Sequence, residues 1–168
     1  GGHYYLIACA LKSGHEYKDD WSSPGKVFAA ELPADVTAYD EDHQLKLEVI
    51  RDGMLKNHGY YKVTENGTES SLICCDNGVF RFYPPAQPGE DWRVEELLDT
   101  PASDATMVDL NGDGELELLV LSPFHGDEIR IYEKKENGYE AVYEYPEKAE
   151  FLHAIWCGTI NGQPVAVI

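Results

Sequence analysis

Basic residues are scarce in this sequence. Its 168 residues include 13 Lys and Arg against 31 Asp and Glu, which gives a formal net charge of −18. A surface with this charge repels phosphate backbones, so the composition argues against nucleic acid as a partner. It attracts cations instead, and bound metal would neutralise part of the excess, although most of the carboxylates are expected simply to face water.

Long apolar runs are missing as well. No segment reaches the roughly 18 consecutive apolar residues that a membrane-spanning helix needs, so no membrane partner is expected. The opening residues Gly1-Gly2-His3 have neither the basic start nor the apolar stretch of a signal peptide. A leader removed from a longer chain stays open as an alternative.

Motifs for zinc–thiolate, hydrolase and nucleotide chemistry are also lacking. The cysteines are Cys9, Cys74, Cys75 and Cys157; none has Cys-x-x-Cys spacing, and most stand in apolar runs, so free thiols are expected. No Ser-His-Asp order, nucleotide-binding loop or nucleophile elbow is present. The sequence therefore gives little support to hydrolase or nucleotide-dependent activity.

Strand-forming and turn-forming residues are abundant. Eleven Tyr, five Phe and three Trp favour strands, while 15 Gly and nine Pro interrupt the chain at short intervals. The clearest unit runs from Asp104 to Pro146. Its pattern predicts four short strands joined by tight turns, at residues 105–110, 116–122, 128–133 and 139–145. Four antiparallel strands of this kind make one blade of a β-propeller.

The same pattern recurs on both sides of this unit. Strands are expected at 59–63, 71–75, 79–83 and 92–98, at 152–160 and 164–168, and, out of phase, at 4–12, 26–32, 37–40 and 46–50. Asn77-Gly78 is a strong hairpin signal in the second of these units. We therefore expect an all-β chain that carries about three propeller blades, each of four antiparallel strands.

The expected domain organisation is a partial ring. It consists of an incomplete blade and connection in 1–50, a blade in 51–99, a blade in 100–148 and the start of another in 149–168. Propellers close with roughly 4–8 blades, so the remaining blades or a second copy of the chain are expected to complete the ring. A stand-alone β-sandwich is the alternative fold.

The turn inside the central unit carries an acidic motif. Residues 109–117 read Asp-Leu-Asn-Gly-Asp-Gly-Glu-Leu-Glu. Oxygen side chains at alternate positions of a tight loop converge on a hard cation, and glycines permit the positive φ angles that such a loop needs. The expected calcium ligands are Asp109, Asn111, Asp113, Glu117 and, through its backbone carbonyl, Glu115. An acidic turn without metal is the alternative.

An EF-hand does not fit this turn. Its twelfth loop position requires a bidentate acid, but that position is Val120, within the apolar run 116–121. The motif instead resembles that of the FG-GAP family, also described as integrin-α-like or VCBS repeats. That family carries an Asp-x-Asp/Asn-x-Asp-Gly-x-x-Asp loop between the first two strands of a blade. Asp109, Asn111 and Asp113 match it, and Glu117 replaces the usual final Asp.

This resemblance covers one blade only, because the corresponding turns at 64–70 and 159–163 lack the acidic pattern. It implies a β-propeller in which the calcium ion is structural. It also implies an extracellular or cell-surface location, with a cytoplasmic one left open as the alternative.

Histidines recur at equivalent places in the blade pattern. His58 and His153 start the first strands of two blades, and Asp104 takes the equivalent place between them. First strands line the central channel of a propeller, and antiparallel geometry returns the loop between strands two and three to the same end. That loop adds His125 and, in the opening blade, His15.

Imidazoles and a carboxylate gathered at one channel mouth suit zinc or another divalent metal, or acid–base chemistry. The second metal site is therefore expected to use His15, His58, His125 and His153, and the candidate catalytic residues are His58, Asp104, His125 and His153. The alternative is that each histidine hydrogen-bonds a carbonyl at a strand end.

Two functions fit these patterns. The first is a calcium-stabilised β-propeller that acts as a binding or scaffold module, with a small molecule or carbohydrate held at the channel mouth. The second is a metal-dependent enzyme with a carbohydrate substrate, resembling lyases that act on oxidised sugars. Whether the protein is an enzyme stays open at this point.

Overall fold

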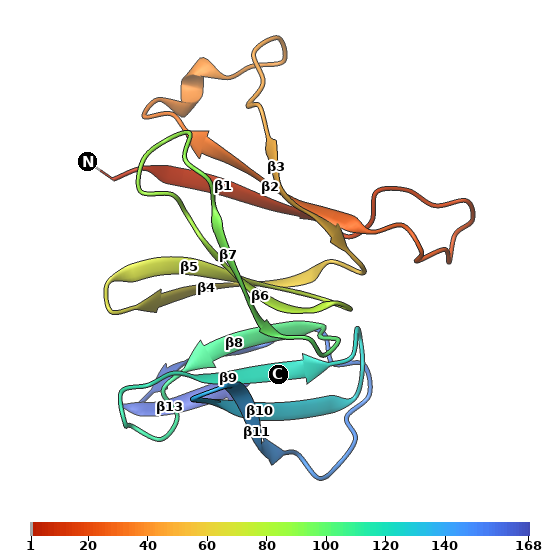
Figure 1. Cartoon of the computed structure of the whole chain (residues 1–168), viewed down its shortest axis with the longest axis vertical. Coiled ribbons are helices and arrows are strands. Elements are labelled where there is room, and N and C mark those ends of the chain that lie inside the picture. Colours follow the sequence, from red (N-terminus) through yellow and green to blue (C-terminus); the bar gives the residue numbers. More distant parts are fainter. Residues whose placement is uncertain (1) are drawn as a thin grey trace. The chain divides into compact units, whose positions relative to one another are not determined.

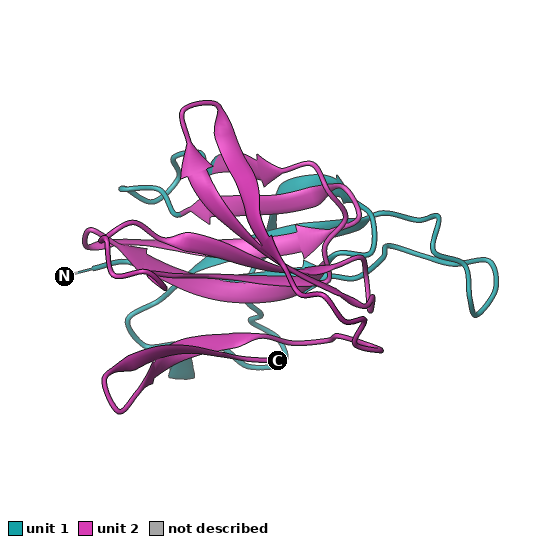
Figure 2. Cartoon of the chain, turned by 90° about the horizontal axis from the view of Figure 1, so that it is seen from below, with its two compact units in different colours: residues 1–57, 84–93 teal, residues 58–83, 94–168 magenta. Residues whose placement is uncertain are grey.

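The computed structural model describes residues 2–168 as an all-β chain of antiparallel sheets, which confirms the all-β part of the expected fold. The strands fall into two compact units (Figure 2). One unit contains residues 2–57 and 84–93, and the other contains residues 58–83 and 94–168. Among the described residues, no helix has the length and apolar character needed to cross a membrane.

The first unit contains a three-stranded antiparallel sheet (Figure 1). Its order is β1-β2-β3, with β1 at Tyr4–Ala10, β2 at Gly25–Leu32 and β3 at Glu48–Met54. The strand expected at 37–40 is wrong, because a short 3-10 helix, η1 (Val36–Ala38), stands there. The Asp35 carboxylate caps it by accepting hydrogen bonds from the Thr37 backbone N–H at 2.9 Å and the Thr37 hydroxyl at 2.6 Å.

The second unit is built from two four-stranded sheets and a hairpin. In the first sheet, β4 to β7 lie in chain order at His58–Glu65, Thr68–Cys75, Gly78–Tyr83 and Arg93–Leu98. In the second, β8 to β11 lie in chain order at Asp104–Val108, Glu117–Ser122, Glu128–Lys135 and Gly138–Glu144. The hairpin pairs β12 (Trp156–Ile160) with β13 (Gln163–Val167). Each four-stranded sheet contains the four consecutive strands that one repeat of the sequence pattern predicts.

Strand β9 lies at the centre of the second unit's core. Leu118 and Val120 pack in one cluster with buried residues of β4, β5 and β6. Leu119 and Leu121 point to the other face of the strand and pack with buried residues of 152–157. All six residues of β9 are buried. The strand is therefore apolar on both faces, as a strand between two packed layers must be.

The first strands of successive sheets lie side by side in this unit. Strand β8 contacts both β4 and β12. His58 is the first residue of β4, and Asp104 is the first residue of β8. This packing brings the beginnings of strands that are distant in the sequence to one place.

All four cysteines are free thiols. Cys74, Cys75 and Cys157 are buried in the second unit, where they fill space as small apolar side chains. Cys9, in strand β1, is exposed although it stands in an apolar run.

Candidate metal centre

Three histidines of the second unit converge. His58 starts β4, His125 lies in the loop between β9 and β10, and His153 lies between β11 and β12. One ligand nitrogen from each lies within 4.8 Å of the other two. The ring centroids are 5.1 Å apart for His58 and His125, 4.9 Å for His58 and His153, and 4.9 Å for His125 and His153. The expected convergence of these three side chains is therefore found.

The loop that carries His125 is closed tightly. The N–H of Gly126 donates to the Pro123 carbonyl at 2.8 Å, and His125 itself has a left-handed φ of 49°. A Cβ on Gly126 would stand 2.4 Å from both the Pro123 nitrogen and the Ser122 carbonyl oxygen. Glycine is therefore required here, and this compact turn directs the imidazole toward the other two.

His58 is fixed in one tautomer. Its Nδ1 lies 3.0 Å from the Ser103 carbonyl oxygen, which only accepts, so Nδ1 carries the proton. The lone pair of His58 is therefore on Nε2. Gly59 allows this close approach of β4 to β8, because a Cβ there would stand 2.6 Å from the same carbonyl oxygen.

Ser103 connects the three histidine-bearing segments. Its carbonyl accepts from His58. Its backbone N–H donates to the Leu121 carbonyl at 2.8 Å, and its hydroxyl donates to the Leu152 carbonyl at 3.4 Å. The N–H of Leu152 in turn donates to the Gly126 carbonyl at 2.9 Å. Sequence analysis missed this fully buried serine. Its only signal is a small hydroxyl residue immediately before Asp104, where the first strand begins.

Asp104 lies beside the histidines but serves mainly to position the chain. One carboxylate oxygen accepts from the Ala105 N–H at 2.9 Å and the other from the Ile155 N–H at 3.0 Å. Burial raises the pKa of Asp104 to about 6, against the opposing effects of these hydrogen bonds and of His58 and His153. Because both oxygens are engaged, Asp104 ties the segment before β12 to β8.

This tie changes the expected strand at 152–160. The Ile155 N–H is held by Asp104 and the Leu152 N–H by Gly126, so neither is available for a sheet ladder. Strand β12 accordingly begins only at Trp156. His153 therefore lies in a loop ahead of the strand rather than at its first residue.

His125 is held neutral by its surroundings. Burial first, and then the neighbouring His58 and His153, lower the pKa of His125 below its ordinary value. Its Nε2 is buried without a hydrogen-bond partner among the described residues. Phe124 stacks on the ring at a centroid distance of 4.0 Å, and Phe151 lies 4.7 Å away on a tilted plane. Phe151, which is 66% exposed, was not foreseen from the sequence.

The donor set fits a borderline divalent metal. Neutral imidazole nitrogens are common ligands of zinc at about 2.0–2.1 Å, which in a tetrahedral site places them roughly 3.3 Å apart. Separations of up to 4.8 Å are wider than that, so binding would draw the three rings slightly inward. His153 is exposed while His58 and His125 are half-buried, so the group is open to solvent on one side.

His15 is not a member of this group. It lies in the loop between β1 and β2, in the first unit, and is exposed. Its participation in the second metal site stays a prediction.

The acidic turn joins β8 to β9. Asp109 accepts from the N–H groups of Gly112 and Gly114, Asn111 from that of Asp113, Asp113 from that of Glu115, and Glu117 from that of Leu110. The Asn111 amide nitrogen stands 3.0 Å from an Asp113 carboxylate oxygen and 3.2 Å from one of Glu117. The side chains of the turn offer oxygen atoms of the kind that calcium binds.

Acidification in the absence of metal is expected to weaken the fold through His125. Its pKa is lowered by folding, so the unfolded chain binds the extra proton. The contribution of this group is therefore present above about pH 6.5 and lost as the pH falls below that value. We expect wild type to lose more stability than His125→Gln between pH 7.5 and 5.5, measured by urea denaturation in EDTA. Equal losses would contradict this. Folding raises the pKa of Asp104, so this group adds stability as the pH falls, but it does so in both proteins.

No protein-family model matches the chain, and no curated protein matches its sequence. The resemblance to FG-GAP repeats therefore rests on the acidic motif and its place between two strands.

Proposed function

We propose that this protein is a metal-binding module built from β-propeller blades. In this proposal His58, His125 and His153 hold a divalent transition metal, with zinc as the first candidate, and a small molecule binds at the open side. The observation that carries the proposal is the convergence of three imidazoles from separate segments, with ligand nitrogens within 4.8 Å of one another.

The surroundings of the histidines support metal binding over hydrogen bonding alone. Metal-ligating histidines commonly donate their second ring N–H to a carbonyl or carboxylate, which fixes the ring and its tautomer. His58 does this with Ser103. The lowered pKa of His125 keeps its imidazole in the neutral form that a metal requires.

The sheet arrangement supports the propeller and the resemblance to FG-GAP repeats. Two successive four-stranded antiparallel sheets pack through one face of β9, residues 152–157 pack on its other face, and the first strands of the two sheets are neighbours. Stacked four-stranded sheets with adjacent first strands are what a propeller requires. An extracellular or cell-surface location remains part of this proposal on the strength of the resemblance.

A structural calcium ion in the acidic turn is a further part of the proposal. Asp109, Asn111, Asp113 and Glu117 are held close together by the hydrogen bonds of the turn. The Glu115 carbonyl is the expected backbone ligand. A bound cation would link the end of β8 to the buried start of β9 at Glu117.

A metal-dependent enzyme is the second candidate function. The exposure of His153 favours it, because three histidines with an open coordination position are typical of catalytic zinc sites. Such a metal supplies Lewis acidity. Around it, Asp104 and Ser103 hold the histidine-bearing segments, and exposed Phe151 offers an apolar face to a sugar ring. A carbohydrate substrate and lyase chemistry rest on the resemblance of this arrangement to lyases that act on oxidised sugars.

Zinc titration tests the proposal directly. With calcium in excess, so that the acidic turn does not compete, isothermal calorimetry should show saturable zinc binding at a single site per chain. At a hundredfold excess over Kd, zinc should raise the free energy of unfolding by about 2.7 kcal/mol. Absence of both the heat signal and the stabilisation would contradict the metal site.

A further inference from the structure

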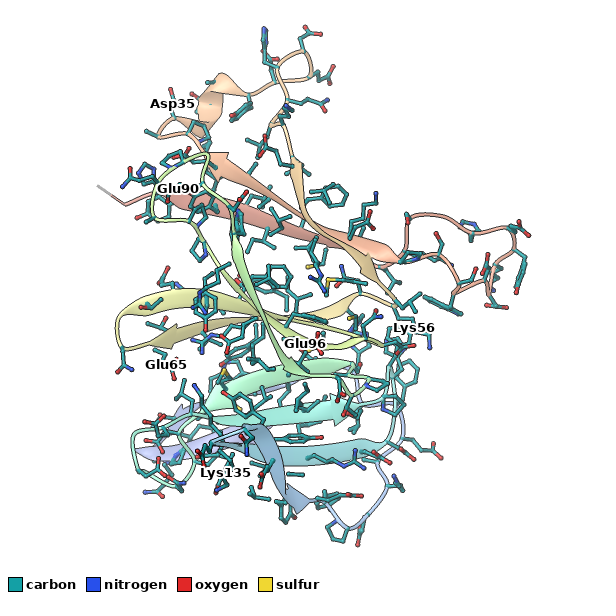
Figure 3. The ribbon with its side chains drawn as sticks, viewed as in Figure 1. Asp35, Lys56, Glu65, Glu90, Glu96 and Lys135 are labelled. Atoms are coloured by element: carbon teal, nitrogen blue, oxygen red, sulfur yellow. The ribbon has the colours of Figure 1, made fainter. Side chains whose placement is uncertain are left out.

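The first unit contains a pocket whose lining includes none of the three clustered histidines. It has a volume of about 690 Å³, within the range of small-molecule sites. Its walls come from strands β1, β2 and β3, from Tyr39, Leu45 and Lys46, and from Pro85 and residues 88–92. Figure 3 labels Glu90 on the loop that follows β6, and this loop belongs to the first unit.

The lining is negatively charged. Four carboxylates, those of Glu31, Glu48, Glu90 and Asp91, line the pocket together with a single basic residue, Lys46. Low-dielectric walls that carry one sign of charge concentrate ligands of the opposite sign. The pocket therefore favours a cation.

Three aromatic residues, Tyr5, Tyr39 and Trp92, line the same pocket. The rings of Tyr5 and Trp92 meet edge to face at a centroid distance of 5.4 Å. The Tyr5 hydroxyl is buried without a hydrogen-bond partner among the described residues. Burial, followed by the charges of Glu31 and Glu90, raises the pKa of Tyr5, so the phenol stays neutral. The hydroxyl has almost no accessible surface, so a ligand that displaced the side chains around it would supply its missing hydrogen bond.

A compact metal ion does not suit these carboxylates. No three of the four described carboxylates lie close enough to one another to share a metal ion. The four carboxylates are therefore spread around the pocket rather than converging on one point. An extended ligand with a charged end and an apolar body matches such a lining better, since aromatic faces also attract cations.

We propose that this pocket binds a small organic cation, a protonated amine attached to an apolar ring or chain. The ammonium group faces the carboxylates, and the apolar body packs against Trp92 and the neighbouring proline side chains of Pro85 and Pro88. This site is independent of the metal centre proposed above.

The test compares the affinity of the pocket for benzylamine with its affinity for two neutral compounds. These are benzyl alcohol, which has the same ring without the charge, and methyl glucoside, a sugar. Calorimetry on the full chain in EDTA should show benzylamine binding at least about tenfold more tightly than benzyl alcohol, and weakening as salt is added. Glu90→Gln should weaken benzylamine binding about two- to fivefold, the range of an exposed ion pair. Tyr5→Phe should weaken it about fivefold by removing the unpaired hydroxyl.

Glu136→Gln is the matched control, because Glu136 is an exposed carboxylate in the second unit. It should bind benzylamine as wild type does. The proposal is overturned if benzyl alcohol binds as tightly as benzylamine, if methyl glucoside binds in its place, or if benzylamine does not bind at millimolar concentration. Circular dichroism of each variant distinguishes loss of binding from loss of folding.

Discussion

Replacing His125 by alanine is expected to lower zinc affinity by about 100-fold or more. Loss of an outer partner of a metal ligand already costs about 10- to 100-fold, so loss of a ligand should cost at least as much. His125 is also held in place by the closed loop and by stacking on Phe124. Calorimetry with a competing chelator measures the change.

His43→Ala and His15→Ala are the matched comparisons. His43 is an exposed histidine whose Nδ1 pairs with Asp40 at 2.9 Å, so its removal should leave zinc affinity unchanged. His15→Ala tests the fourth ligand that the sequence predicts. Zinc binding by His125→Ala with wild-type affinity would disprove the three-histidine site, whatever the result for His15.

Removing calcium is expected to lower the free energy of unfolding by about 3–4 kcal/mol. That is the stabilisation given by a ligand at roughly 100 to 1,000 times its Kd when it binds only the folded protein. Asp113→Ala should abolish the difference between calcium and EDTA, because it removes a charged ligand from the turn. Thermal and urea denaturation, each with and without calcium, measure the effect.

Glu115→Gln is the control for the calcium turn. Its side chain is exposed and is not an expected ligand, since only its carbonyl is. The variant should therefore keep the calcium response. A wild-type stability that is the same in calcium and in EDTA would contradict the structural ion.

Strand positions were the most predictable part of this fold. The apolar stretch 116–122 and the expected strand at 79–83 correspond closely to β9 and β6, because alternation and turn residues mark them locally. The structure of the segment at 37–40 could not be predicted from alternation and turn residues. A single capping side chain, Asp35, outweighs the weak strand preference of the residues after it.

The candidate site was predictable in its residues but not in its supports. His58, His125 and His153 follow from strand order and antiparallel geometry. Ser103 and Phe151 do not, because their roles depend on side chains that meet only after the layers pack. The role of Asp104 could not be predicted from the sequence either. It was expected to be chemically active, but both of its carboxylate oxygens accept hydrogen bonds from backbone N–H groups.

The network around Ser103 also has a kinetic consequence. It joins segments far apart in the chain, so the three ligands come together only after β4, the β9–β10 loop and the segment before β12 have docked. Such long-range contacts form late when loop closure is costly. A metal bound there would stabilise the native state without stabilising the folding transition state. It should therefore slow unfolding and leave the rate of folding nearly unchanged.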